Sequence, residues 1–150
     1  MNNESGRSLI EMLGVLALAG IVSFGAIAMY RTARLRQTRF IAEQELKTLA
    51  ENAKIIYSGR QNYTGITKDF LIKTGALKVE RIAGQDFRIQ SQGDGKTFSI
   101  VFENLNMSDC AYFATKRFDW TEAVAVNGFT DNPVSFCAEL HPNRLEFIIR

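Results

Sequence analysis

Hydrophobic and polar residues follow two different patterns in the first third of this chain. From Met12 to Tyr30, nineteen consecutive residues carry no charge, and most of them are apolar. A helix of about 20 residues covers the roughly 30 Å hydrocarbon core of a bilayer. The run from Leu9 to Tyr30 is therefore long enough to span a membrane as a helix.

After residue 39 the apolar residues adopt a helical period. They recur at steps of one, three or four, at Ala42, Leu46, Leu49, Ala50, Ala53, Ile56 and Tyr57. The opposite face is polar, with Glu43, Lys47, Glu51, Asn52 and Lys54. Such a stripe is typical of an amphipathic helix, and Glu43 and Lys47 have the spacing of a favourable surface pair. No proline interrupts residues 1–132. We therefore expect one helix from about Leu9 to Tyr57, with Gly59 as its C-terminal cap.

The remaining pattern predicts a small domain of mixed secondary structure. Thr67 and Gly75 flank a short expected helix at residues 68–74. Strands are expected at residues 86–90, 97–102, 123–126 and 145–149, with a hairpin turn at 92–96. A further helix is expected at 107–115, with Asn106 or Ser108 near its start. The predicted fold class is α+β: a long N-terminal helix whose outer, amphipathic half packs on a small antiparallel sheet.

Composition alone would suggest an ordinary soluble domain. The chain has 150 residues, 46% of them hydrophobic and 23% charged, and this length favours one domain. The aromatic content of 11% argues against intrinsic disorder. A polytopic membrane protein is excluded because no second apolar run reaches half the length of the first. The mean hydropathy of −0.08 averages two different halves.

The charge is small overall but unevenly placed. The net charge of +2 does not indicate a nucleic-acid partner. Residues 1–39 hold five arginines and two glutamates (5 − 2 = +3), and residues 40–150 hold 13 basic and 14 acidic residues (13 − 14 = −1). Most of the surplus lies in Arg31, Arg34, Arg36 and Arg39. We interpret it as a sign of membrane proximity, since anionic headgroups would lie there, although a solvated helix face has the same composition.

Three interpretations of the apolar run compete. A secretory signal peptide would have a basic start and a shorter apolar region, and residues 1–6 contain no Lys or Arg. A buried core helix that is apolar all round is rare in a small domain. A permanent N-terminal membrane anchor fits both the length and the flanks, and we favour it.

Two cysteines, Cys110 and Cys137, are separated by 26 residues without a zinc-binding spacing. In the cytosol they would be buried thiols, whereas an exported domain would join them in one disulfide. An even number of cysteines behind a membrane anchor favours the disulfide.

Catalytic chemistry has little support in the residues. His141 is the only histidine, and the chain has no nucleophile elbow, zinc-protease motif or phosphate-binding loop. No second histidine can join His141 at a metal site, so we expect no metal. Because the catalytic and phosphate-binding motifs are absent from the sequence, we also expect no cofactor and no enzyme activity. Trp120 is interpreted as a core or interface residue.

Glu11 is the anomalous residue of the apolar segment, two positions after Leu9. A carboxylate within a membrane-spanning segment is costly and is by default a functional hypothesis. It either reaches water at the interface or meets a positive charge on another chain.

The residues around Glu11 resemble the N-terminus of type IV prepilins and pseudopilins. The stretch Gly6-Arg7-Ser8-Leu9-Ile10-Glu11-Met12-Leu13-Gly14 has the family's spacing between a leader-ending glycine and a glutamate five residues later. The cysteine pair near the C-terminus, the loop at residues 57–65 and the segment 98–110 look like the b subclass of type IV pilins.

This resemblance implies a structural subunit of a type IV pilus. A prepilin peptidase would cut between Gly6 and Arg7, Arg7 would carry a methylated amine, and Glu11 would pair with that amine on a neighbouring copy. The implied regions are a leader (1–6), a membrane-spanning and filament-core helix (7–30), and a soluble head (31–150) that includes the amphipathic helix half (31–57). The implied partners are further copies of the chain, an inner-membrane assembly platform and, before assembly, membrane lipid.

The resemblance also implies a cellular location for the head, and it leaves two alternative functions open. The head would be periplasmic before assembly and part of an extracellular pilus afterwards, serving adhesion, motility or the transfer of DNA or protein. Arg31 to Arg39 would place the head in the cytoplasm by the positive-inside rule, and the motif and the cysteine pair outweigh that rule. The chain departs from the family in its leader without basic residues, in Arg7 as first mature residue and in the missing helix proline. The alternatives are a pseudopilin of a secretion or DNA-uptake machine and a membrane-anchored binding domain that does not polymerise.

Overall fold

A computed structural model describes the backbone of residues 4–150 and the side chains of residues 9–150. Of the expected leader, only the backbone of residues 4–6 is described, and the Arg7 side chain lies outside the described residues. The chain divides into two compact units, one extending to Phe40 and one comprising Ile41–Arg150.

The first helix, α1, runs from Glu4 to Tyr57 without interruption. It begins before the expected Leu9, since no proline precedes that residue to stop it. It ends at the predicted residue but not with the predicted cap, because Gly59 is not among the residues with a left-handed backbone. Instead the Ser58 hydroxyl donates to the Ile55 carbonyl at 2.7 Å, and the Arg60 N–H donates to the Tyr57 carbonyl at 2.8 Å. A serine side chain and a turn thus satisfy the last carbonyls.

The short helix α2 (Lys68–Lys73) is capped as expected. The Thr67 side chain accepts a hydrogen bond of 3.2 Å from the Phe70 N–H. Beyond the end of the helix, Gly75 has a φ of +75° and its N–H donates to the Ile72 carbonyl at 3.0 Å. Only a glycine adopts this conformation without strain.

Four antiparallel strands form one sheet in the order β1-β2-β4-β3. Their bounds are β1 Phe87–Ser91, β2 Phe98–Leu105, β3 Ala123–Val126 and β4 Asn143–Ile149. The expected hairpin joins β1 to β2. β2 ends three residues later than predicted, because a bulge between Phe102 and Leu105 lets the strand continue through Asn104 at a φ of +62°. β4 begins two residues early, at the buried Asn143.

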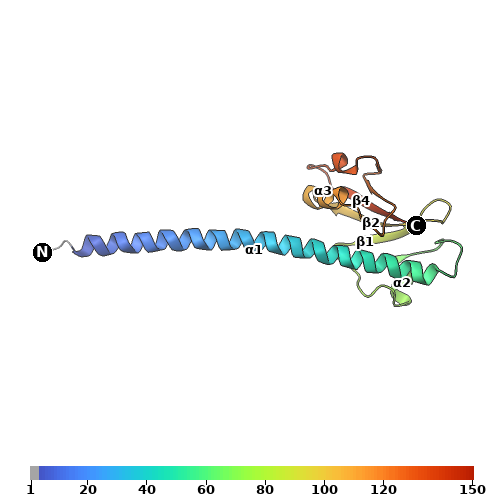
Figure 1. Cartoon of the computed structure of the whole chain (residues 1–150), viewed down its shortest axis with the longest axis horizontal. Helices are drawn as coiled ribbons and strands as arrows, with labels where there is room; N and C mark the ends of the chain where they lie inside the picture. Colours follow the sequence, from blue (N-terminus) through green and yellow to red (C-terminus); the bar gives the residue numbers. More distant parts are fainter. Residues whose placement is uncertain (1–3) are drawn as a thin grey trace. The chain divides into compact units, whose positions relative to one another are not determined.

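Helix α3 (Met107–Thr115) and the 3₁₀ turn η1 (Pro133–Phe136) complete the second unit. Asn106 is the N-cap of α3, and its side-chain oxygen accepts from the Asp109 N–H at 2.9 Å. α3 contacts β3, β4 and η1. Figure 1 shows the sheet beside the C-terminal part of α1, with α3 next to β4. The α+β prediction, a helix packed on a small antiparallel sheet, is confirmed.

The core forms where the amphipathic stripe of α1 meets the inner face of the sheet. Leu46, Leu49, Ala50, Ala53 and Tyr57 are all buried, as predicted. They join a single cluster with the sheet residues Phe98, Ile100, Leu145, Phe147 and Ile149. Phe147 and Trp120, whose ring centroids are 5.4 Å apart, anchor an aromatic group in this cluster. Trp120 is therefore a core residue.

Candidate functional site

The apolar part of α1 displays its side chains rather than burying them. Leu9, Ile21, Phe24 and Met29 are between 63% and 81% exposed. By length and composition, α1 is the one helix in the described residues that could cross a membrane. Exposing a run of this size to water is strongly unfavourable, so an apolar environment around the helix would stabilise it.

Hydroxyl groups in and after this segment are bonded within the helix. The Ser23 hydroxyl donates to the Ala19 carbonyl at 2.8 Å, and the Thr32 hydroxyl donates to the Ala28 carbonyl at 3.1 Å. In an apolar medium an unbonded hydroxyl costs several kcal/mol. The segment therefore presents no unsatisfied hydroxyl at these positions.

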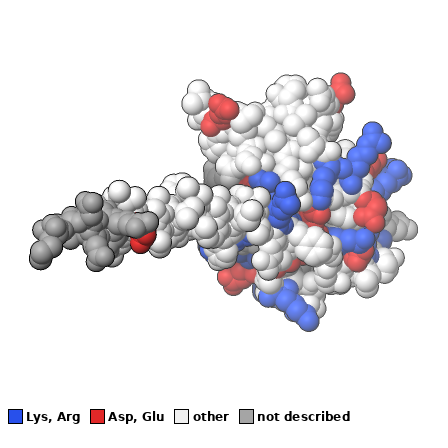
Figure 2. All heavy atoms as spheres, turned by 60° about the vertical axis from the view of Figure 1, so that its left-hand side comes forward, with Lys and Arg blue, Asp and Glu red and all other residues white. Residues whose placement is uncertain are grey.

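Glu11 lies in α1 and is exposed. It is the only charged residue between Leu9 and Tyr30, and within residues 9–150 it forms no ion pair. Figure 2 shows one acidic side chain on an otherwise uncharged stretch next to the undescribed end. The chain thus offers one carboxylate to whatever surrounds this helix. The backbone at Gly6 is helical, and the Arg7 side chain is not described, so their predicted processing stays a prediction.

The three glycines of the apolar segment have no packing partner in this chain. A Cβ at Gly14, Gly20 or Gly25 would meet nothing within 4 Å. Small residues on a membrane helix let a second helix approach closely. These positions therefore offer close approach to another molecule rather than a role in the chain's own fold.

Two side chains in the second half of α1, Glu43 and Lys47, form hydrogen bonds with residues far along the chain. The Tyr112 hydroxyl and the Lys116 ammonium both donate to Glu43 Oε1, and Lys47 Nζ donates to Asp119 Oδ2 at 3.1 Å. The hydrogen bond to Glu43 raises the pKa of Lys116, as the bond to Asp119 raises that of Lys47. Glu43 and Lys47, whose spacing predicts a surface pair, thus each bind a different partner.

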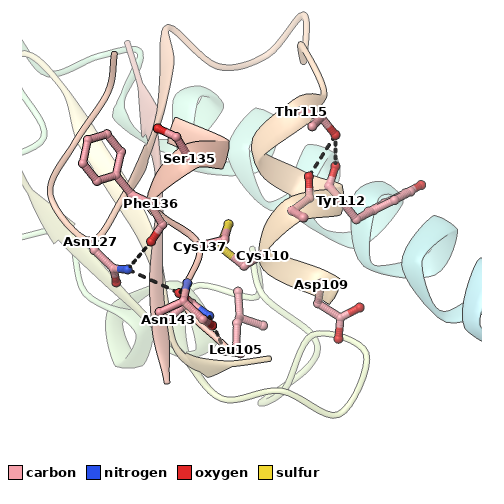
Figure 3. Close-up of a disulfide and its surroundings, with 12 residues drawn as sticks. Leu105, Asp109, Cys110, Tyr112, Thr115, Asn127, Ser135, Phe136, Cys137 and Asn143 are labelled. Atoms are coloured by element: carbon pink, nitrogen blue, oxygen red, sulfur yellow. Dashed lines mark hydrogen bonds between the residues drawn. A yellow bond between two sulfur atoms is a disulfide. The ribbon is translucent and has the colours of Figure 1, made fainter. Parts of the chain in front are cut away.

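Cys110 and Cys137 form a disulfide, as predicted, with their Cα atoms 5.9 Å apart. It joins the buried face of α3 to the residue that follows η1. Figure 3 shows the bridge beside the side chains of Asn127 and Asn143. The disulfide therefore holds the irregular segment around η1 against α3.

Asn143 is fully buried and holds the same segment by hydrogen bonds. Its amide nitrogen donates to the carbonyls of Leu105 (3.2 Å) and Ala138 (2.9 Å), and its oxygen accepts from the Ala138 N–H at 2.7 Å. Asn127 donates from its side chain to the Phe136 carbonyl at 2.8 Å and accepts from the Arg144 N–H at 2.9 Å. Neither asparagine was identified from the sequence as an anchor of this segment.

This fixed segment carries exposed apolar groups. The rings of Phe129 and Phe136 stack with centroids 4.0 Å apart and are 52% and 37% exposed. Leu140, in the same segment, is 91% exposed. Grouped apolar residues held rigidly at a surface are typical of an interaction site.

No arrangement suited to catalysis stands out in the part of the chain that the structure describes. Within residues 4–150, no group of three His, Cys, Asp or Glu side chains lies close enough to bind a metal ion. His141 is exposed in the turn before β4. The features that distinguish this chain are surfaces rather than a chemical centre.

Comparisons with known proteins agree with this description. No family model matches the chain. Over 124 residues it is 25% identical to the major structural subunit of the bundle-forming pilus from Escherichia coli O127:H6, and equally to that of Escherichia coli O111:H-. The match covers 75% of this chain, and the chain spans 64% of the length of these relatives. Both relatives are described as structural subunits.

The fold has a close counterpart among solved structures. The crystal structure of TcpA, a type IV pilin from the El Tor biotype of Vibrio cholerae, matches with a TM-score of 0.63 at 15% sequence identity. The match covers 76% of this chain and 99% of TcpA. At this identity the likeness establishes the fold.

Proposed function

We propose that this chain, which is similar in sequence to pilus subunits and in fold to a type IV pilin, belongs to the type IV pilin family and is a structural subunit of an extracellular pilus. The observation that carries the proposal is the apolar half of α1, which is helical, exposed and long enough to span a membrane. The apolar core of the second unit, residues 41–150, forms a folded head. The subunit contributes by assembling rather than by catalysing a reaction.

The precursor carries the leader 1–6, and a prepilin peptidase cuts it after Gly6. The new amine on Arg7 is then methylated. Residues 7–30 hold the subunit in the inner membrane among lipid, and residues 31–150 form a periplasmic head. From there an assembly platform transfers the apolar helix from lipid into the filament, where it packs against other copies.

Glu11 guides this transfer through electrostatics. A carboxylate in a low-dielectric environment is strongly penalised unless a positive charge lies beside it. The amine at Arg7 of a neighbouring copy supplies that charge only when the two helices have the correct stagger. A subunit that enters in register is therefore favoured over one that does not.

The test is filament yield from cells that produce the chain together with its assembly machinery. Glu11→Ala and Glu11→Gln remove the charge and are expected to lower the yield of sheared filaments about tenfold or more, while Glu11→Asp retains part of it. Glu51→Ala, at an exposed carboxylate outside the apolar segment, is the matched control. Precursor levels in the membrane are measured in parallel.

N-terminal sequencing of the filaments tests the processing step, with Arg7 expected as the first residue. Normal filament yield from Glu11→Ala would refute the pairing mechanism. An uncleaved chain that never leaves the membrane would refute the proposed function and favour a membrane-anchored binding domain.

A further inference from the structure

Two stretches of this chain carry net charges of opposite sign. Residues 12–42 contain four arginines and no Asp or Glu. Residues 118–143 contain Asp119, Glu122, Asp131 and Glu139 and no Lys or Arg. In the view of Figure 2, acidic atoms along the upper edge of the folded unit have no basic atoms beside them.

Most of these charges have no counter-ion within the chain. Asp119 is bonded to Lys47, but within residues 9–150 no ion pair forms at Glu122, Asp131 or Glu139. The same holds, within that range, for Arg31, Arg34 and Arg36. All six side chains are exposed. Three arginines and three carboxylates are thus available to a partner.

The two stretches also match in their apolar content. The acidic one carries the stacked rings of Phe129 and Phe136. The basic one carries Leu35 and Phe40, which are 55% and 60% exposed. An apolar centre with a charged rim is the usual composition of a protein–protein contact.

We propose that the helical stretch at residues 31–40 of one copy docks on the acidic, aromatic surface at residues 118–143 of a second copy. The inference rests on the proposed function in that copies assemble side by side. Bundled helices would bring their arginines together and repel one another, and carboxylates from another copy remove that cost. Anionic lipid would neutralise the arginines equally well but offers nothing to the acidic surface. A second copy satisfies both surfaces at once.

A charge exchange tests the contact in the full chain. Arg31→Glu, Arg34→Glu and Arg36→Glu together are expected to lower filament yield about tenfold, as are Glu122→Lys, Asp131→Lys and Glu139→Lys together. Combining the two sets restores opposite charges across the contact and is expected to recover most of the yield. Lys73→Glu, Lys78→Glu and Arg150→Glu, at exposed positions outside both surfaces, form the matched control.

A cross-linking experiment tests the contact whether or not filaments form. Arg31→Lys, Arg34→Lys and Arg36→Lys keep the charge and add amines that a carbodiimide joins to carboxylates in direct contact. Membranes holding an equal mixture of light and ¹⁵N-labelled chains are cross-linked and digested. We expect peptides that join a light residue 31–36 to a heavy Glu122, Asp131 or Glu139.

The outcomes separate this contact from the proposed function. Mixed-isotope links with recovery by the combined variant support it. Links only within one isotope, or loss of yield from the arginine set but not from the acidic set, overturn it, and the latter result assigns the arginines to lipid. A wild-type chain that makes no filament but gives mixed-isotope links would refute the pilus subunit and leave the contact standing.

Discussion

The Tyr112 hydroxyl on α3 donates a 2.7 Å hydrogen bond to the Glu43 carboxylate on α1, across 69 positions of sequence. Lys116 adds a second donor to the same oxygen, and the Glu43 side chain is only 16% exposed. The carboxylate therefore links the amphipathic half of α1 to the helix that carries Cys110. Glu43 lies at the edge of the apolar stripe of α1, and these two hydrogen bonds explain how a polar residue at this position stabilises the fold.

Removing this carboxylate is expected to destabilise the head. Glu43→Ala removes the Glu43 acceptor of the Tyr112 hydroxyl and one of the two acceptors of the Lys116 ammonium, which also donates to the Tyr112 hydroxyl, and should lower the free energy of unfolding by about 1–3 kcal/mol. Urea denaturation of the full chain in detergent micelles measures the change, with Glu51→Ala as the control on the exposed face of α1. Tyr112→Phe should cost less, and the double variant less than the sum of the two. Additive losses would show that the two groups do not interact.

The pair Lys47–Asp119 predicts a specific pH dependence of stability. The hydrogen bond from Lys47 lowers the pKa of Asp119 from its ordinary 3.8, and the same bond raises the pKa of Lys47 from its ordinary 10.5. A lowered acid pKa contributes stability above the unfolded-state pKa that is lost as the pH falls through the folded-state value. A raised lysine pKa contributes stability below the unfolded-state pKa that is lost as the pH rises through the folded-state value.

Asp119→Asn is therefore expected to be slightly less stable than the wild type near neutral pH and equally stable at both extremes. The effect is small because both side chains are exposed and screened. Denaturation midpoints measured across the pH range check this. A difference that persists at a pH low enough to protonate the carboxyl in both the folded and the unfolded state would contradict the assignment to this pair.

The disulfide is expected to be the largest single contributor to the stability of the C-terminal segment. Cys110 and Cys137 are 27 positions apart, and closing a loop of this length stabilises by about 3–4 kcal/mol on the chain-entropy estimate. Replacing both residues by serine should lower the free energy of unfolding by about that amount. Wild-type chain measured under reducing conditions is the control and should match the double variant. Alkylation of both cysteines without prior reduction would contradict the presence of the bridge.

Replacing Asn143 is expected to lower the free energy of unfolding as much as replacing an apolar core residue. Asn143→Ala removes the partners of the buried Leu105 carbonyl and of both half-buried backbone groups of Ala138, which should cost about 2–4 kcal/mol because these groups lose their hydrogen bonds. Gln90→Ala, at an exposed strand position, is the control in the same denaturation experiment. A loss no greater than that of Gln90→Ala would mean that water replaces the asparagine.

The sequence predicted the elements that depend on local pattern. The period of the stripe identified the buried face of α1, and the apolar run at residues 123–126 gave the bounds of β3. The extension of β2 through Asn104 escaped prediction because a bulge depends on the partner strand rather than on local periodicity. Gly59 was assigned as a cap from residue type alone, and the nearby Ser58 hydroxyl took that role.

The candidate site was predictable where one residue breaks a pattern. Glu11 is visible as a single charge in an apolar run, and the cysteines are visible by number and context. Asn143 and Glu43 look like ordinary polar residues, and only the distant groups that bond them, at Leu105 and Tyr112, give them a role. Contacts between residues so far apart in sequence leave no periodic signal.

Enlarging the glycines of the apolar segment is expected to affect assembly and not folding. A side chain at Gly14, Gly20 or Gly25 meets nothing within 4 Å in the chain, so Gly20→Leu should leave the unfolding of the head unchanged. In the filament the same change holds neighbouring helices apart, and we expect a several-fold lower yield. Ala26→Leu, which adds comparable bulk at an exposed position on a different face of the helix, is the matched control, with both precursors quantified in the membrane. Equal yields from the two variants would show that the helices do not approach one another at Gly20.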